Sequence, residues 1–523
     1  MKSTFLLPLL LGITVVNTPL ARADWPQWRG PNRNGVAGDD AKLPAELTDE
    51  NGPKKLWESE SIPSDHDGGH GSVVVADGKV FLSVVWHSDV PTETRRFDSR
   101  AMSALGFRGT NGLDPDVVAA MEHERENLGR RMRGAALDEW AQKWVEEHLD
   151  KKTQLSLGSW IIGRFKQGKS AIPISVYETL QEAGKREFAN QAEMEAWVNE
   201  QGFDPDLAKR IINAVPSTRK VANDVVVCVN ADTGETIWKF TTPGSPTGRG
   251  SSSTPAVSGG KVFAALSDNL YALDVKDGTE IWRAPLSKKG PASSPLVVGD
   301  HLYLQENQLT AYHAGTGEKL WQNQDANGSN PSPAIWSDGD RAVILCNGTK
   351  SFVGVDAATG DTLWTTDGGG DSTPSVSGDV VVIASKEEGK NLIAYRLKPD
   401  GSGPEQLWSR DFLARRYGSS PIIHGDRVFH LGSERHLCVD LKTGETIWER
   451  EASSSISSPM LADGKLCVYE NRGGFLALID AEAAEYRSLG RAKVGALYCA
   501  SPAIVGKRLY LRTPGSVVAF EFP

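Results

Sequence analysis

The sequence predicts an all-β fold: an eight-bladed β-propeller of four-stranded antiparallel blades, with a mainly α-helical insertion in the first blade. Three observations lead to this prediction. A turn followed by a tryptophan recurs about every forty residues. A second element, a small hydroxyl residue followed by proline and a β-rich run, alternates with that turn. The β pattern stops from residue 90 to residue 222 and then resumes.

In the turn element, a glycine comes a few residues before each tryptophan, and from Trp238 onward the tryptophans follow at intervals of 39 to 44 residues. The glycine supplies the left-handed backbone conformation that a short hairpin needs. The tryptophan is large enough to pack onto a neighbouring unit. We therefore predict seven structural docking residues: Trp57, Trp238, Trp282, Trp321, Trp364, Trp408 and Trp448.

The second element marks the first strand of each unit. It begins at Thr254, Ser294, Ser332, Thr373, Ser420, Ser458 and Ser501, and Ser72 begins a copy without the proline. A single four-stranded sheet cannot bury both faces, so the units must stack, and radial stacking of such sheets makes a propeller. The chain opens with a copy of a last strand, Lys54–Trp57, and ends with copies of the first three strands. We expect the N-terminal strand to complete the final blade and to cover two sheet edges.

The N-terminal residues suggest an exported protein. Residues 1–23 have the features of a signal peptide: Lys2, an apolar run from Phe5 to Val16, and a small-x-small cleavage box at Ala21-Arg22-Ala23. No later stretch approaches the ~18 apolar residues that span a bilayer. The expected organisation is a signal peptide (1–23), an N-terminal segment (24–53), a propeller (54–89 and 223–523) and a helical insertion (90–222), in the periplasm or outside the cell.

The composition excludes two classes of protein. The chain has 39% hydrophobic residues and a net charge of −10 over 523 residues, which is not the composition of a disordered protein. A pI near 5.6 without a basic stripe argues against nucleic-acid binding. The five cysteines are scattered and are predicted to be small buried apolar residues, although an oxidising compartment leaves a disulfide open.

The insertion is predicted to be helical. Asp114-Pro115 and Asp204-Pro205 are typical of a helix N-cap followed by the first helical residue. Further helices are expected over residues 137–149 and 191–200, with Trp140, Trp144 and Trp197 available for a small core. Two interpretations stay open: a lid or partner-docking module on one propeller face, or a solvated structural elaboration.

Polar residues gather where the inner strands of the propeller are expected to begin, at one mouth of the axial channel. Seven of them are predicted to bind a polar or anionic small ligand: His70, Arg249, Asn330, Asp371, Arg416, Tyr417 and Tyr498. A hydrated funnel is the alternative.

No catalytic residue and no metal site are predicted. The spacing of His66, Asp67, His70 and His87 is more typical of a loop than of a metal site. Trp25 and Trp28 precede the ring, and the sequence leaves open whether they pack against it or form a contact surface.

The Asp-x-x-Thr-Gly-x-x-x-Trp repeat resembles the tryptophan-docking repeat of the PQQ-like (pyrroloquinoline-quinone) propellers, a superfamily that contains quinoprotein alcohol dehydrogenases and proteins with BamB-like repeats. Residues 25–31, Trp-Pro-Gln-Trp-Arg-Gly-Pro, resemble the N-terminal motif of a group of secreted bacterial members. The resemblance covers nearly all of residues 24–89 and 223–523.

Two functions are implied by this resemblance. The first is a non-catalytic binding or assembly scaffold in the cell envelope, with an envelope protein or a small polar ligand as partner. The alternative is an oxidoreductase using PQQ at the propeller mouth, with Asp371 as base and Arg249 or Arg416 on the quinone carboxylates. The chain lacks the adjacent cysteines of the dehydrogenases, and Asp371 and Asn330 are the only oxygen ligands near the mouth, fewer than calcium requires. No cofactor is therefore expected.

Overall fold

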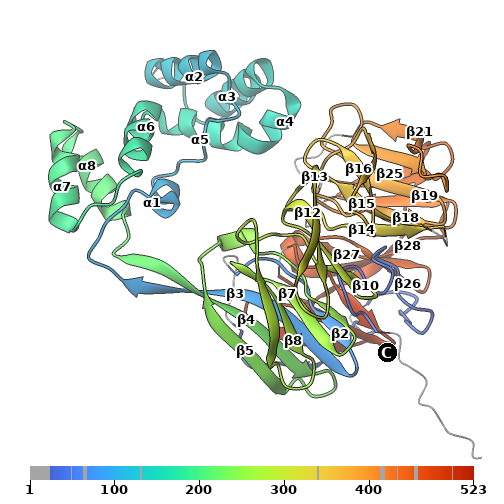
Figure 1. Cartoon of the computed structure of the whole chain (residues 1–523). Coiled ribbons are helices and arrows are strands. Elements are labelled where there is room, and N and C mark those ends of the chain that lie inside the picture. The colour runs from blue at the N-terminus through green and yellow to red at the C-terminus, as the bar shows by residue number, and fades with distance from the viewer. Residues whose placement is uncertain are drawn as a thin grey trace, which may run out of the picture.

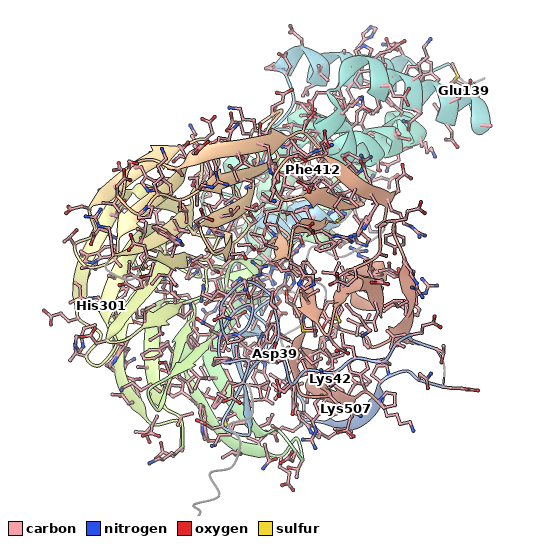
Figure 2. All side chains as sticks on the ribbon, turned by 90° about the vertical axis from the view of Figure 1, so that its right-hand side faces the viewer. Asp39, Lys42, Glu139, His301, Phe412 and Lys507 are labelled. Carbon is pink, nitrogen blue, oxygen red and sulfur yellow. The ribbon has the colours of Figure 1, made fainter. Side chains whose placement is uncertain are left out.

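A computed structural model describes residues 24–48, 50–62, 68–129, 132–338, 341–412, 418–432, 434–452, 457–497 and 499–523. The expected signal peptide, residues 1–23, lies outside this part. Eight four-stranded antiparallel sheets are formed by the described residues. Figure 2 shows the strands running around a ring, with the N-terminal segment that carries Asp39 and Lys42 near its centre. This arrangement is a β-propeller, as the repeats predict.

Seven of the sheets in the described part use consecutive strands. They are β2 (Val74–Ala76), β3 (Lys79–Pro91), β4 (Thr218–Asn230) and β5 (Thr236–Gly244); β6 (Ala256–Ser258), β7 (Lys261–Ala265), β8 (Asn269–Asp274) and β9 (Glu280–Pro285); β10 (Leu296–Val298), β11 (His301–Gln305), β12 (Asn307–His313) and β13 (Lys319–Gly328); β14 (Ala334–Ser337), β15 (Ala342–Asn347), β16 (Phe352–Asp356) and β17 (Thr362–Thr366); β18 (Ser375–Ser377), β19 (Val380–Ala384), β20 (Leu392–Arg396) and β21 (Glu405–Arg410); β22 (Ile422–His424), β23 (Arg427–Leu431), β24 (Arg435–Asp440) and β25 (Thr446–Glu451); and β26 (Met460–Ala462), β27 (Lys465–Glu470), β28 (Phe475–Asp480) and β29 (Ser488–Lys493).

The remaining sheet joins the two ends of the chain. Strand β1 (Lys54–Glu58) pairs antiparallel with β32 (Val517–Glu521), followed by β31 (Arg508–Arg512) and β30 (Ala503–Val505). Trp57 lies opposite Ala519 and Lys55 opposite Phe520. The N-terminal strand therefore covers the outer edge of the last sheet, as expected from the order of the repeat.

The repeat tryptophans dock one sheet on the next through the glycine of the neighbouring turn. The indole N–H of Trp238 donates to the backbone oxygen of Val275 at 3.2 Å, in the turn that also contains Gly278. A Cβ on Gly278 would lie 2.5 Å from the Trp238 ring, and Gly278 has a φ of +75°. The glycine is therefore needed twice, for its conformation and for the close approach of the indole.

The same contact recurs around the ring. Trp57, Trp282, Trp321 and Trp408 lie against Gly234, Gly317, Gly360 and Gly444 respectively. In the β26–β29 sheet a tyrosine stands in the turn between β28 and β29: Trp448 meets Tyr486 edge-on, with ring centroids 5.4 Å apart.

Helices lie between β3 and β4 and form a separate body (Figure 1). They are α1 (Ser99–Ala104), α2 (Pro115–Asn127), α3 (Ala135–His148), α4 (Lys151–Thr153), η1 (Gln154–Gly158), α5 (Ser159–Gln167), η2 (Gly168–Ser170), α6 (Ile174–Ala183), α7 (Gln191–Glu200) and α8 (Pro205–Ala214). As predicted, Asp114 and Asp204 cap α2 and α8, each with a proline in the first turn. Trp144 is buried in the core of this body, and Trp140 and Trp197 pack against it.

The insertion boundaries require a correction. Residues 90 and 222, expected as its limits, lie inside strands, because β3 continues to Pro91 and β4 starts at Thr218. The two strands pair along their whole length, up to Pro91 opposite Thr218. The ends of both strands are largely polar and only partly buried, so their composition resembles that of a loop. We call residues 92–217 the helical arm, and the outer parts of β3 and β4 its ribbon.

All five cysteines are free thiols, four of them buried and Cys499 half-buried. Burial raises the pKa of the Cys228, Cys438 and Cys467 thiols to about 12, so these thiols are not reactive thiolates. Among the described helices, none is long and apolar enough to cross a membrane.

Candidate functional site

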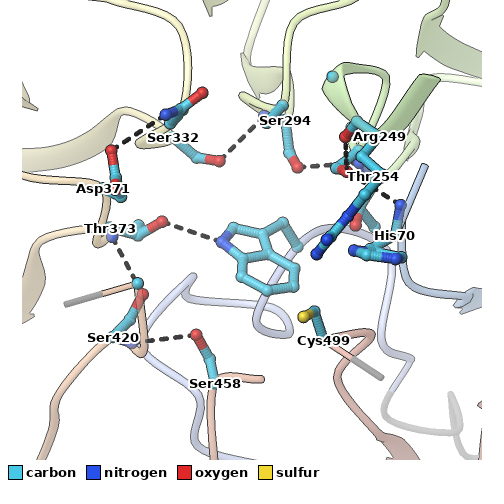
Figure 3. A pocket seen from close by; sticks show the side chains of 16 residues that line it. His70, Arg249, Thr254, Ser294, Ser332, Asp371, Thr373, Ser420, Ser458 and Cys499 are labelled. Carbon is cyan, nitrogen blue, oxygen red and sulfur yellow. Dashed lines mark hydrogen bonds between the residues drawn. The ribbon is translucent and has the colours of Figure 1, made fainter. Parts of the chain in front are cut away.

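A belt of hydroxyl groups surrounds the axis where the first strand of each sheet begins. Between neighbouring sheets of the described residues a backbone N–H donates to the side-chain hydroxyl of the next sheet, at seven of the eight steps: Ser72 to Thr254 (2.9 Å), Thr254 to Ser294 (2.9 Å), Ser294 to Ser332 (2.9 Å), Thr373 to Ser420 (3.0 Å), Ser420 to Ser458 (3.1 Å), Ser458 to Ser501 (3.0 Å), and Ser501 to Ser72 (2.8 Å). These seven bonds form one run that starts at Thr373, passes through Ser72 and ends at Ser332, so the hydroxyls encircle the axis except between Ser332 and Thr373 (Figure 3). This belt explains why the repeat carries Ser or Thr before its proline.

The N-terminal segment fills the middle of this belt. The indole N–H of Trp28 donates to Thr373 Oγ1 at 2.9 Å, which is the dashed line at the centre of Figure 3. Trp25 exchanges two backbone hydrogen bonds with Val75, and Pro26 accepts from Val257 N. The open question about Trp25 and Trp28 is thereby answered: both pack against the ring. We call residues 24–37 the plug.

Two arginines of the plug are buried inside the ring. Arg29 donates to Ser375 Oγ (2.8 Å) and to the backbone oxygen of Pro421 (2.5 Å). Arg33 donates to the backbone oxygens of Pro295 (2.7 Å) and Ser294 (3.0 Å). Burial lowers the pKa of each guanidinium to about 9, with a further contribution at Arg29 from the neighbouring Arg33 charge. Both remain cationic at neutral pH, and neither has a carboxylate partner among the described residues.

A cavity of about 420 Å³ lies above Trp28 at the mouth of the ring. It is lined by His70, Arg249, Asn330 and Asp371, so four of the seven predicted ligand-binding residues come together there. The lining also includes four residues that occupy the same position in their repeats as His70: Ser252, Ala292, Gly418 and Cys499. Arg416, Tyr417 and Tyr498 lie outside the described residues, as do His66 and Asp67.

The rim of the cavity is held by local hydrogen bonds. Asp371 accepts from the Asn330 amide at 3.0 Å and forms an ion pair with Lys386 Nζ at 2.7 Å. On the other side, His70 N donates to Ser252 Oγ (2.9 Å), and Ser252 Oγ donates to the Arg249 backbone oxygen (2.7 Å). Figure 3 shows the Arg249 side chain reaching from the rim toward the indole.

The arrangement suits an oxygen-rich anionic ligand. Each belt hydroxyl accepts one N–H and keeps its own O–H as a donor. Arg249 stands on the rim, and Arg29 and Arg33 place two more positive charges behind the Trp28 floor. In a partly desolvated cavity such charges attract anions strongly.

The residues do not fit calcium-bound PQQ. Calcium takes six or more oxygen ligands. Asp371 is the one carboxylate among the described residues that line the cavity, and Lys386 already neutralises it. We therefore derive no step through this cofactor.

The structure also places His70 and His87, two of the histidines considered for a metal site, in different cavities. His70 lines the mouth, whereas His87 accepts from Gly248 N at 3.2 Å and lines a different cavity.

Sequence reasoning missed Trp28, Arg29, Arg33 and Lys386 as parts of the mouth and its surroundings. The Trp-Pro-Gln-Trp-Arg-Gly-Pro motif was the available signal, since two tryptophans and an arginine in seven residues are unusual for an exposed leader.

Comparisons with known proteins agree with this architecture. The protein family described as "Outer membrane protein assembly factor BamB" matches residues 222–335, 325–402 and 400–522, a range that begins after the helical arm. The chain is 25% identical over 324 residues to the assembly factor BamB of Burkholderia pseudomallei, covering 57% of this chain and 80% of that protein. It is 25% identical over 275 residues to BamB of Xanthomonas campestris pv. campestris, covering 41% of this chain and 66% of that protein.

Two solved structures are also similar. BamB from Moraxella catarrhalis superimposes with a TM-score of 0.46 at 17% identity, covering 57% of this chain and 88% of that one. Quinohemoprotein alcohol dehydrogenase from Comamonas testosteroni superimposes with a TM-score of 0.42 at 14% identity, covering 58% and 72% of the two chains.

Proposed function

This chain belongs to the family of the outer membrane protein assembly factor BamB, and from that premise we propose that it is an exported, non-catalytic binding scaffold of the cell envelope. In this proposal the eight sheets are the blades of one closed propeller, which serves as a rigid base. The helical arm is the element that docks a protein partner, and the mouth is a second site for a polar or anionic ligand.

The observation that carries the proposal is the independent core of the arm. Its buried apolar cluster is drawn from residues between Phe97 and Val215, all of them within the arm. Figure 1 shows this body standing away from the sheets on the β3–β4 ribbon. A body with its own core on a ribbon exposes most of its surface to a partner while the base stays closed.

A buried ionic network supports the rigidity of the arm. Glu122 on α2 pairs with Arg125 and with Arg164 of α5, and both guanidinium groups are almost fully buried. Burial alone would raise the pKa of Glu122, but the hydrogen bonds from the two arginines lower it overall. The carboxylate therefore stays ionised at neutral pH and ties α2 to α5.

Excising the arm tests the proposal. Pro91 and Thr218 lie directly opposite each other, so an Asn-Gly turn can replace residues 92–217 and close β3 and β4 as a hairpin. We expect this variant to keep the thermal unfolding midpoint of the ring and to lose the partner that crosslinks to the full chain in an envelope fraction. A matched control, Asn330→Ala at the mouth, should retain that crosslink.

Two outcomes would contradict the proposal. The same partner crosslinking to the armless variant would place docking elsewhere, and no crosslink to either protein would remove the scaffold role. Reduction of a dye by the full chain with alcohols or sugars, after addition of PQQ and Ca²⁺, would establish the oxidoreductase alternative.

A further inference from the structure

Two cavities adjoin where the helical arm leaves the ring. The larger, about 790 Å³, lies between the ribbon, the first residues of the arm and the loop Pro246–Gly248. The smaller, about 470 Å³, lies between α1 and the end of α6. Arg96, Asp98 and Ser99 line both cavities, so the two form an adjacent pair with these residues between them. We call this pair the joint furrow; α1 marks its position in Figure 1.

Cationic side chains predominate along the joint furrow. Those that line it are Arg96, Arg100, Arg108, Lys185, Arg219 and Lys220. The carboxylates among its described lining residues are Asp98 and Glu187. Because the whole chain has a net charge of −10, this furrow is a local exception on an acidic protein.

Three of these cations have no carboxylate to neutralise them. Arg100 is paired with Asp89 and Asp98, at 2.9 Å each. Lys220 is also paired with Asp89, at 3.5 Å, and Lys185 is paired with Glu182. By contrast, Arg96, Arg108 and Arg219 are exposed, and no carboxylate of the described residues forms an ion pair with them. Their positive charge is therefore available to a ligand.

The position of Arg96 is fixed by the arm itself. Its Nε donates to the backbone oxygen of Gly184 at 2.7 Å, at the end of α6. This bond holds the base of the guanidinium and leaves its two terminal amino groups for another acceptor. A guanidinium oriented in this way suits a bidentate carboxylate.

The floor of the smaller cavity is apolar. Phe97 and Met102 are buried beneath it, and the Phe107 ring lies tilted against Tyr177, with the ring centroids 4.7 Å apart. An apolar side chain entering here would cover aromatic surface, while carboxylates on either side of it would reach Arg96 and Arg108.

We propose that the joint furrow binds an acidic segment of the partner protein, one that carries apolar side chains among its carboxylates. This inference rests on the proposed scaffold function and names the chemistry of its partner. A furrow of two adjoining cavities is larger than a single inorganic anion can fill, and its apolar floor matches a peptide rather than a polyanion without hydrophobic groups. A segment bound here contacts the arm and the ring together, since Thr247 and Gly248 of the ring form one wall.

The test uses the full chain and a fluorescein-labelled synthetic peptide of Glu, Leu and Phe residues. Reversing two charges, Arg96→Glu with Arg108→Glu, should weaken binding by about tenfold or more, because each change removes an attraction and adds a repulsion. The matched control is Lys209→Glu, an exposed lysine on α8 outside the furrow, which should leave the affinity within about twofold. Added salt should weaken binding to the unaltered chain.

Three results would overturn the inference: equal binding of the same peptide with Gln in place of Glu, tighter binding of a single-stranded oligodeoxynucleotide of equal charge, or unchanged affinity of the doubly reversed variant. Crosslinking of the partner in an envelope fraction, compared between the doubly reversed variant and the armless variant, distinguishes failure of this inference from failure of the scaffold proposal. If the doubly reversed variant keeps the crosslink and the armless variant loses it, the furrow assignment is wrong and the scaffold function stands.

Discussion

Replacing Gly278 by alanine is expected to lower the free energy of unfolding by roughly 2–5 kcal/mol, from left-handed strain and overpacking together. Gly278 has a φ of +75°, and its new Cβ would lie 2.5 Å from the Trp238 ring. The indole cannot move away without losing its hydrogen bond to Val275 O. Denaturant unfolding followed by tryptophan fluorescence measures the change.

Gly260 provides the matched control. Its φ is +74°, but nothing lies within 4 Å of a Cβ built on it. Gly260→Ala should therefore cost only the strain, about 1–2 kcal/mol. Equal losses in the two variants would show that the tryptophan-glycine contact does not join the blades.

Replacing Trp57 by alanine should be the most damaging of the tryptophan substitutions, at about 3–5 kcal/mol for a large buried aromatic side chain. Trp57 is 8% exposed and donates to the Ala231 backbone oxygen at 3.1 Å. It lies on β1, so its loss also loosens the strand that closes the ring. Denaturant unfolding should show the lower stability, and limited proteolysis should show faster cleavage near residue 50.

Trp86→Ala is the control for that substitution. Trp86 lies on the ribbon, half-buried, with Lys239 Nζ 4.2 Å from its ring centroid. Its loss should cost about 1–2 kcal/mol, because the half-buried ring contacts the edge of the core as well as the Lys239 cation. A Trp57 variant as stable as the Trp86 variant would contradict closure of the ring by β1.

The ring could be predicted from sequence because its contacts repeat. Five of the seven repeat tryptophans, Trp57, Trp238, Trp282, Trp321 and Trp408, meet the glycine of the next turn. One local sequence pattern therefore predicts both a strand and its contact with the neighbouring sheet. The helix starts at Pro115 and Pro205 were equally readable, since the Asp that caps each helix is adjacent in sequence to the first helical residue. The pairing of β1 with β32 followed from the order of strand types along the chain.

The surroundings of the mouth could be predicted only in part. Repeat register placed His70, Asn330 and Asp371 at one level, because equivalent residues of equivalent strands share a height in the ring. Register does not reveal that the plug turns into the ring, since Trp28 and Thr373 are 345 residues apart. The extent of the ribbon was missed for a different reason: its polar strands are stabilised by pairing with each other, which composition does not report.

Two features define this molecule: the N-terminal strand β1 closes the ring, and the helical arm is a separate body attached to that ring. Native-state hydrogen exchange, read by mass spectrometry across the full chain, tests both features in one measurement. We predict that the amides of β1 are as protected as those of β5, the outermost strand of another sheet. We also predict that the amides of the arm core exchange together, at a rate that differs from that of the ring. Rapid exchange of the β1 amides beside a protected β32 would contradict closure of the ring by β1. Exchange of the arm core at the same rate as the ring would contradict an arm that is a separate body.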